Sequence, residues 1–176
     1  MNRLIPFLAV AVLAAATAAR GAFVEPTRDQ LKAAAQHPPM VVALVQDANV
    51  EQAAQVARGV FIEIINLDLE DEERDQRLTD VVFHLYAAFP DSHKGLSSAL
   101  GRMVAASPAA SMSAEVVSAI QLGVIKATNT ANGNTFGNAY TLAMQTVAGA
   151  PGGGKTVPPQ PPPPPVALPY EAQRLL

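Results

Sequence analysis

The stretch NVEQAAQVARGVFIEI, residues 49–64, decides the fold class of this chain. Its apolar side chains recur at steps of three and four, which places them on one face of an α-helix, and Asn49 is a favourable N-cap. The pattern therefore predicts an amphipathic helix whose inward face carries Ala53, Val56, Ala57, Val60, Phe61 and Ile64.

Segments of the same kind lie on both sides of this helix and predict an all-α domain over residues 25–148. Upstream, Thr27 and Gln30 have the spacing of a capping box, and the helix that they open runs to Gln36. Pro38 and Pro39 can start the next helix, because proline is tolerated in a first turn. No stretch alternates between apolar and polar residues with period two, so we expect little or no sheet.

Four more helices are expected downstream. The fourth begins near Asp68, with Asp68 as its cap, and ends at Phe89; the fifth ends near Ser107. The sixth starts at Ser111 or Ser113, and Asn132-Gly133-Asn134 reads as a turn before the seventh. Inward positions in these four helices are Leu78, Val81, Val82, Leu85, Phe89, Leu96, Leu100, Met103, Val104, Val116, Val117, Ile120, Val124, Phe136, Tyr140, Ala143, Met144 and Val147.

Two arrangements of these helices fit the sequence. Valine pairs begin the apolar part of three helices, at residues 41, 81 and 116, which are 40 and 35 positions apart. Such spacings are near those of stacked helical hairpins. Valine pairs are common in this composition, however, so the first expectation is a small irregular bundle of six or seven helices, with a short array of stacked hairpins as the alternative.

Residues 1–18 have the three parts of a secretory signal peptide. Arg3 precedes an uncharged apolar run from Leu4 to Ala16, and small residues at positions 16 and 18 mark a cleavage site; cleavage after Gly21 also fits. The run is shorter than the roughly 20 residues of a membrane-spanning helix. We expect an exported protein, periplasmic or secreted, without a stable membrane anchor after cleavage; an uncleaved signal anchor is the alternative.

Residues 149–176 form a Gly/Pro-rich tail that is expected to be disordered. Consecutive prolines fix the backbone in the polyproline II conformation, which makes a semi-rigid rod. The rod either docks into a partner or serves only as a spacer. In the first interpretation the partner-binding residues are Pro161, Pro162, Pro163, Pro164, Pro165 and Tyr170.

The composition excludes several classes of function. The net charge is −3 and no basic patch is present, so nucleic acid is not an expected partner. The chain has no cysteine, which excludes thiolate zinc sites and a lipoprotein anchor. We expect no cofactor and no metal.

One segment matches the phosphate-binding loop pattern letter for letter, from Gly149 to Thr156. That loop works only when a helix starts at its lysine and directs N–H groups at the phosphates. Here Val157-Pro158-Pro159 follows, which forbids such a helix. We interpret the segment as a glycine-rich hinge and expect no nucleotide.

The remaining motifs have ordinary structural interpretations. The acidic run over residues 68–75 lacks the ligand spacing of an EF-hand. We interpret it as the solvent-exposed start of a helix, stabilised by the ion pairs Glu70–Arg74 and Glu73–Arg77. The alternative is a weak cation-binding site. The histidines at 37, 84 and 93 lack ligand spacing. The segment from Gly95 to Ala99 faintly resembles a serine nucleophile elbow, which requires a strand before it.

No catalytic set emerges from these residues. We expect a non-catalytic, exported helical protein that binds an unknown protein or envelope component. The alternative is a carrier of a small apolar ligand held in the Ala/Val-lined core, and an open apolar pocket would distinguish it.

Overall fold

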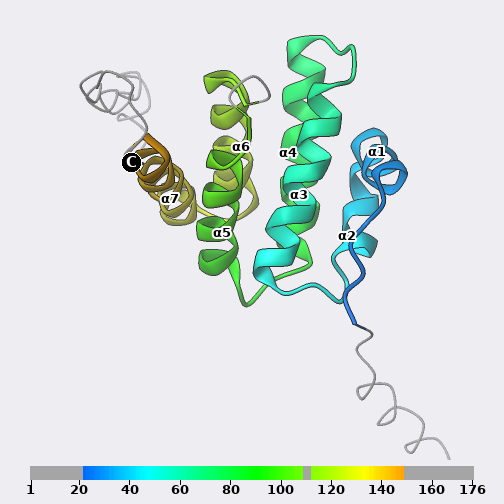
Figure 1. Ribbon diagram of the computed structural model, residues 1–176, viewed down its shortest axis with the longest axis horizontal. Coiled ribbons are helices and arrows are strands. Elements are labelled where there is room, and N and C mark those ends of the chain that lie inside the picture. Colours follow the sequence, from blue (N-terminus) through cyan, green and yellow to red (C-terminus); the bar gives the residue numbers. More distant parts are fainter. Residues whose placement is uncertain (1–21, 109–111, 149–176) are drawn as a thin grey trace, which may run out of the picture.

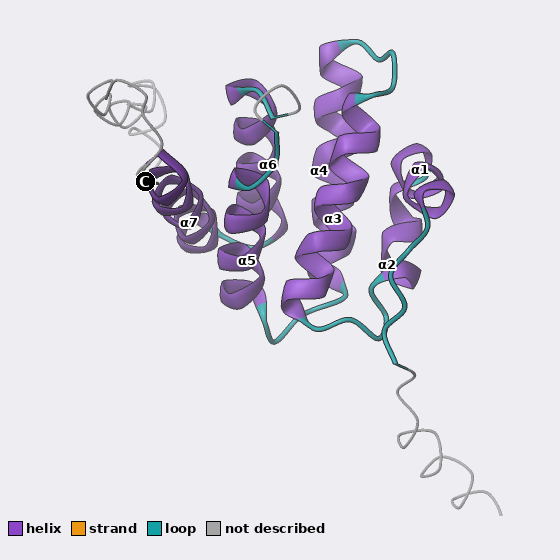
Figure 2. Cartoon of the chain, in the orientation of Figure 1, coloured by secondary structure: helices purple, strands orange, loops and turns teal. Residues whose placement is uncertain are grey.

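The computed structural model describes residues 22–108 and 112–148, and within them every regular element is a helix, which confirms the all-α prediction (Figure 2). The signal segment 1–18 and the tail 149–176 lie outside the described residues. In chain order the elements are α1 (Arg28–Gln36), the 3₁₀ turn η1 (Pro38–Met40), α2 (Val41–Leu44), α3 (Val50–Ile65), α4 (Asp71–Ala87), α5 (His93–Ala105), α6 (Ala114–Ala127) and α7 (Thr130–Ala148).

The helices stack in two layers. One layer contains α1, α3, α5 and α7, each packed on the next, and the other contains η1 with α2, then α4, then α6. Figure 1 shows the pairs following one another from α1 and α2 at one end to α7 at the other. The pairs α1–α2 and α3–α4 pack as hairpins, and α7 packs on both α5 and α6, so the described helices form the expected small bundle with the layered stacking of the alternative. The three valine pairs fall in the second layer, on α2, α4 and α6.

Side-chain caps fix three helix starts where the sequence places them, those of α1, α3 and α6. Thr27 and Gln30 form the predicted capping box of α1, and Asn49 and Gln52 form another at the start of α3. The hydroxyl of Ser113 accepts from the backbone N–H of Val116 at the start of α6, so Ser113 rather than Ser111 is the cap. These caps depend only on neighbours in sequence, which is why the local pattern finds them.

The predicted cap at Asp68 is wrong. Helix α4 starts at Asp71 with Glu70 as its N-cap residue, and no side chain caps it. The N–H groups of Leu67 and Leu69 bond to carbonyls just behind them, which continues the turn at the end of α3 and delays the next helix. Three carboxylates in the first turn of α4 instead offset the helix dipole.

The predicted turn at Asn132-Gly133-Asn134 is also wrong, because α7 runs through it. The helix starts earlier, where the Asn129 side chain accepts from the N–H of Asn132 at 3.0 Å. Gly133 is required by packing rather than by a turn. A Cβ at Gly133 would overlap the side chain of Ile125 on α6, so the glycine lets α6 and α7 approach closely.

The core is mostly aliphatic, with few large rings. Phe61, Tyr86 and Phe136 are its largest fully buried side chains, and alanines fill many of the positions between helices. Small side chains allow helices to pack at short distances. Gly101 of α5 lies directly against the α7 backbone at Phe136, and no buried side-chain N or O in the described residues lacks a hydrogen-bond partner.

Candidate functional site

Stacking places two interhelix loops side by side, and a groove of about 900 Å³ opens between them. The first loop connects α2 to α3 and the second connects α4 to α5. The groove is open to solvent. Its lining consists of Pro39, Val42, Ala43, Val45, Gln46, Asp47, Ala48, Asn49, Val50, Ala88, Phe89, Pro90, Asp91 and Ser92. We call it the loop groove.

Backbone hydrogen bonds hold both loops in place. In the first loop the N–H of Ala48 donates to the carbonyl of Val45 at 3.1 Å, and the capping box of Asn49 ends the loop. In the second loop the N–H of Ser92 donates to the carbonyl of Phe89 at 3.1 Å. The turns are therefore tied to helix ends, and the groove is a preformed surface rather than one that a ligand must build.

The lining combines apolar walls with negative charge. Asp47 and Asp91 are both exposed, one from each loop, and neither forms an ion pair within the described ranges. No lysine, arginine or histidine of the described chain lines the groove. Val42, which is 39% exposed, presents apolar surface beside these carboxylates. Such a surface suits a peptide segment that carries both aliphatic and cationic side chains.

A buried polar cluster lies behind the second loop. The Tyr86 hydroxyl is 2.7 Å from the Ser97 Oγ, and the Ser97 hydroxyl donates to the carbonyl of His93 at 2.8 Å. Burial raises the pKa of Tyr86 to about 12. The His93 ring packs on the Tyr86 ring, with centroids 5.5 Å apart. The cluster joins α4 to α5 and so fixes the loop between them.

This geometry shows that the serine-containing segment 95–99 is part of a helix and does not form a nucleophile elbow. Ser97 lies inside α5, is fully buried and has its hydroxyl proton engaged by the carbonyl one turn earlier. No strand precedes it in the described chain. Ser97 is a packing residue in the described structure.

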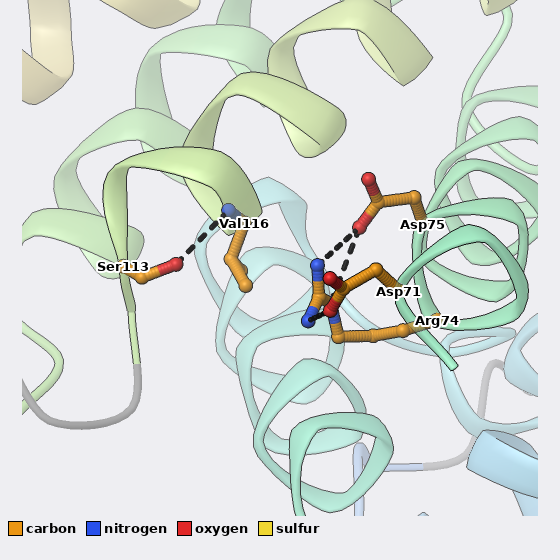
Figure 3. A network of polar contacts seen from close by, with 5 residues as sticks. All are labelled: Asp71, Arg74, Asp75, Ser113 and Val116. Atoms are coloured by element: carbon orange, nitrogen blue, oxygen red, sulfur yellow. Dashed lines mark hydrogen bonds and ion pairs between the residues drawn. The ribbon is translucent and has the colours of Figure 1, made fainter. Parts of the chain in front are cut away.

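The acidic run contains ion pairs at the start of α4. Arg74 bonds to both Asp71 and Asp75, with the Ser113 cap of α6 nearby (Figure 3), and Arg77 bonds to Glu73 at 2.8 Å. The Glu73–Arg77 pair was predicted, whereas Arg74 pairs with Asp71 and Asp75 rather than with Glu70. In the described parts of the chain no three His, Cys, Asp or Glu side chains are grouped so that they could hold a metal ion.

The three histidines lie apart. His37 sits between α1 and η1, His84 packs edge-on against Phe83 of α4, and His93 begins α5. The predicted partner-binding residues Pro161 to Pro165 and Tyr170, and the phosphate-loop pattern at 149–156, lie outside the described residues. These predictions stay predictions.

Sequence reasoning did not find the loop groove. The two loops carry similar turn residues, Asp47 with Asn49 and Asp91 with Ser92, but these mark only helix boundaries when read locally. The two loops lie close together in space only because one helical hairpin stacks on the next. The valine pairs at residues 41 and 81 were the available signal of this stacking, but their spacing of 40 differs from the 44 positions between Asp47 and Asp91, so they did not identify the two loops that meet.

None of the described helices combines the length and apolar character needed to cross a membrane. Searches of family models, curated proteins and solved structures yield no match to this chain.

Proposed function

We propose that this protein is an exported, non-catalytic interaction protein that holds an extended segment of another polypeptide in the loop groove. The observation that carries the proposal is the groove itself, which is apolar in its walls, acidic at both loops and free of cationic side chains among the described residues. Export rests on the signal-peptide pattern of residues 1–18.

Electrostatics support a partner with cationic side chains. Residues 22–148 contain eight Lys and Arg against fourteen Asp and Glu, a net charge of −6. Complementary charge steers association and fixes register more than it adds affinity. Asp47 and Asp91 would accept the cations, while Val42 and Phe89 would contact the aliphatic side chains between them.

The packing favours this role over the carrier of a small apolar ligand. The carrier requires a pocket within the Ala/Val-lined core, but the loop groove, the hollow between α4 and α6 and the hollow between α5 and α7 all open at the surface. The core itself is closely packed around Phe61, Tyr86 and Phe136. The tail would act as a tether or second contact, which adds avidity when both sites engage.

Site-specific photo-crosslinking in the exported protein tests the proposal. A crosslinker at Val42 should capture a polypeptide, whereas one at Leu122, which is 49% exposed on α6, should not. Reversing both groove charges with Asp47→Lys and Asp91→Lys should abolish capture. The matched control is Asp68→Lys with Glu70→Lys, which makes the same charge change at exposed positions before α4 and should leave capture intact.

Two outcomes of these crosslinking experiments would contradict the proposed binding in the loop groove. Equal capture from Val42 and Leu122, or equal loss in the two charge-reversal variants, would show that the loop groove is not the contact surface. Comparison of the full chain with a variant ending at Gly149 separates the groove from the tail, because the groove contact should persist without residues 150–176.

A further inference from the structure

Helix α3 presents two different faces to its neighbours. Toward the core its side chains are apolar and fully buried, namely those of Ala53, Ala57, Val60, Phe61 and Ile64. Toward α1 and the segment before it, α3 presents one side that carries Gln52, Gln55, Val56, Gly59 and Glu63. The part of α3 beneath α1 is therefore more polar than its core face.

Helix α1 gains little from hydrophobic burial. Figure 1 shows it at one end of the stacked helices, and Ala34 and Ala35 are its buried residues. Each of these alanines buries a single methyl group. Leu31 is partly buried and rests on Gly59 of α3, where an added Cβ would lie 2.9 Å from its Cδ1. Since isolated helices shorter than about 12–15 residues are marginal in water, α1 depends on its other contacts.

Charged side chains supply the specific contacts that hold α1 and the segment before it to the other helices. Two of these contacts lie at or before the amino end of α1 and the third lies at its carboxyl end, so polar groups fix the helix at both ends. Within the described residues they join Arg28 Nε to a carboxylate oxygen of Glu63 at 2.9 Å, Gln55 to Glu25 at 3.2 Å, and Arg77 of α4 to the carbonyls of Ala35 and Gln36 at 3.3 and 3.2 Å.

The Arg28–Glu63 ion pair is unequally exposed. The Glu63 side chain is 9% exposed, whereas the Arg28 side chain is 69% exposed. Closing α1 over α3 thus takes the carboxylate out of water and supplies one cation that compensates for its charge. Without this cation the closed state would contain an uncompensated buried charge, which is strongly destabilising. The carboxylate would then regain water only if α1 moved away.

We propose that α1 and the segment before it form a lid on α3, latched by Arg28 on Glu63, which opens as a unit while α3 to α7 stay folded. Elements that bury few apolar groups open at a lower free energy than the core, and α1 is such an element. The hinge is His37, where the backbone leaves the helical conformation between α1 and η1. No α1 residue lines the loop groove, so the lid does not depend on the proposed function.

Hydrogen–deuterium exchange of the mature chain, read by mass spectrometry, tests the lid. In the native protein the amides of α1 should exchange at least about tenfold faster than those of α4 and α6. Arg28→Met removes the latch and should accelerate exchange in α1 by about tenfold more, without changing α4 to α7. The matched control is Arg102→Met, which removes another Arg–Glu pair with α3, one in which both side chains are exposed, and should leave α1 unchanged.

Cysteine labelling gives a second readout, because the chain contains no cysteine. Val56 is buried beneath the lid, so Val56→Cys should react slowly with a maleimide and about tenfold faster when combined with Arg28→Met. Ile120→Cys, buried in α6, should stay unreactive in both backgrounds. The proposal is overturned if α1 amides exchange no faster than those of α4 and α6, or if Arg28→Met and Arg102→Met have equal effects. Faster exchange in every helix of Arg28→Met also overturns it.

Discussion

The hydroxyl of Tyr86 lies 2.7 Å from the Ser97 Oγ, in the buried junction between α4 and α5. Ser97 gives its one hydroxyl proton to the carbonyl of His93, so Tyr86 is the donor to Ser97. The hydrogen bond between these two side chains thus joins α4 to α5 within an otherwise apolar junction. Because the loop between α4 and α5 forms one wall of the loop groove, this pair connects core packing to the proposed binding surface.

The Tyr86 hydroxyl should make the protein lose stability at alkaline pH. Burial raises the pKa of Tyr86 from 10.0 to about 12, so the folded state favours the protonated tyrosine. The folded-state value is the higher one, so this contribution is complete below pH 10 and is lost as the pH rises toward 12. A pKa difference of this size corresponds to at most about 3 kcal/mol in the free energy of unfolding.

Urea unfolding at a series of pH values measures this loss. Tyr86→Phe is the control, because it removes the ionisable group and keeps the ring. The variant should be less stable than the native chain at neutral pH and should show a shallower decline above pH 10. Equal slopes for the two proteins would mean that Tyr86 ionises in the folded state as readily as a free tyrosine.

Local signals in the sequence were sufficient for the helices and most of their starts. The capping box of Thr27 with Gln30 and the N-cap at Asn49 act through hydrogen bonds three residues apart, so the sequence alone identifies these two starts. The wrong cap at Asp68 arose from local backbone bonds of Leu67 and Leu69, whereas the wrong turn at residues 132–134 arose from tertiary contact. Gly133 resembles a turn residue, but it is small because Ile125 of α6 occupies the space of a Cβ.

The loop groove could not be predicted from local sequence patterns, because it also depends on tertiary contacts. Asp47 and Asp91 are 44 positions apart, and only the stacking of one hairpin on the next brings their loops together. The valine pairs hint at that stacking but do not fix which faces meet. The site residues that were predicted, Pro161 to Pro165 and Tyr170, lie outside the described chain and await a binding experiment.

Export should remove the amino-terminal segment. Mass spectrometry of the exported protein should find a chain that starts near Ala19 or Ala22, because small residues precede both positions. Leu8→Arg is the matched test, since a charge in the apolar run should block export and retain the precursor. An exported chain that begins at Met1 would contradict the signal-peptide interpretation.

Two glycines of α5 should respond to alanine with opposite signs. At Gly101 a Cβ would overlap the carbonyl oxygen of Phe136 and lie 3.0 Å from the backbone nitrogen of Tyr140, so α7 has to shift. Overpacking of this kind costs about 1–3 kcal/mol. At Gly95 the nearest atom to a Cβ is a Val50 methyl at 3.8 Å, an ordinary contact, and alanine should add about 0.4–1 kcal/mol of stability.

Thermal unfolding of Gly101→Ala and Gly95→Ala separates the two effects. Gly101 lies in the interior of α5, where alanine also adds helix propensity, so a loss of stability at this position reports the contact of α5 with α7. A lower melting temperature for Gly101→Ala and a higher one for Gly95→Ala are expected. If both variants gained stability, the backbone of α7 would have room to move away from α5, and the close approach at Gly101 would not be a fixed feature of the fold.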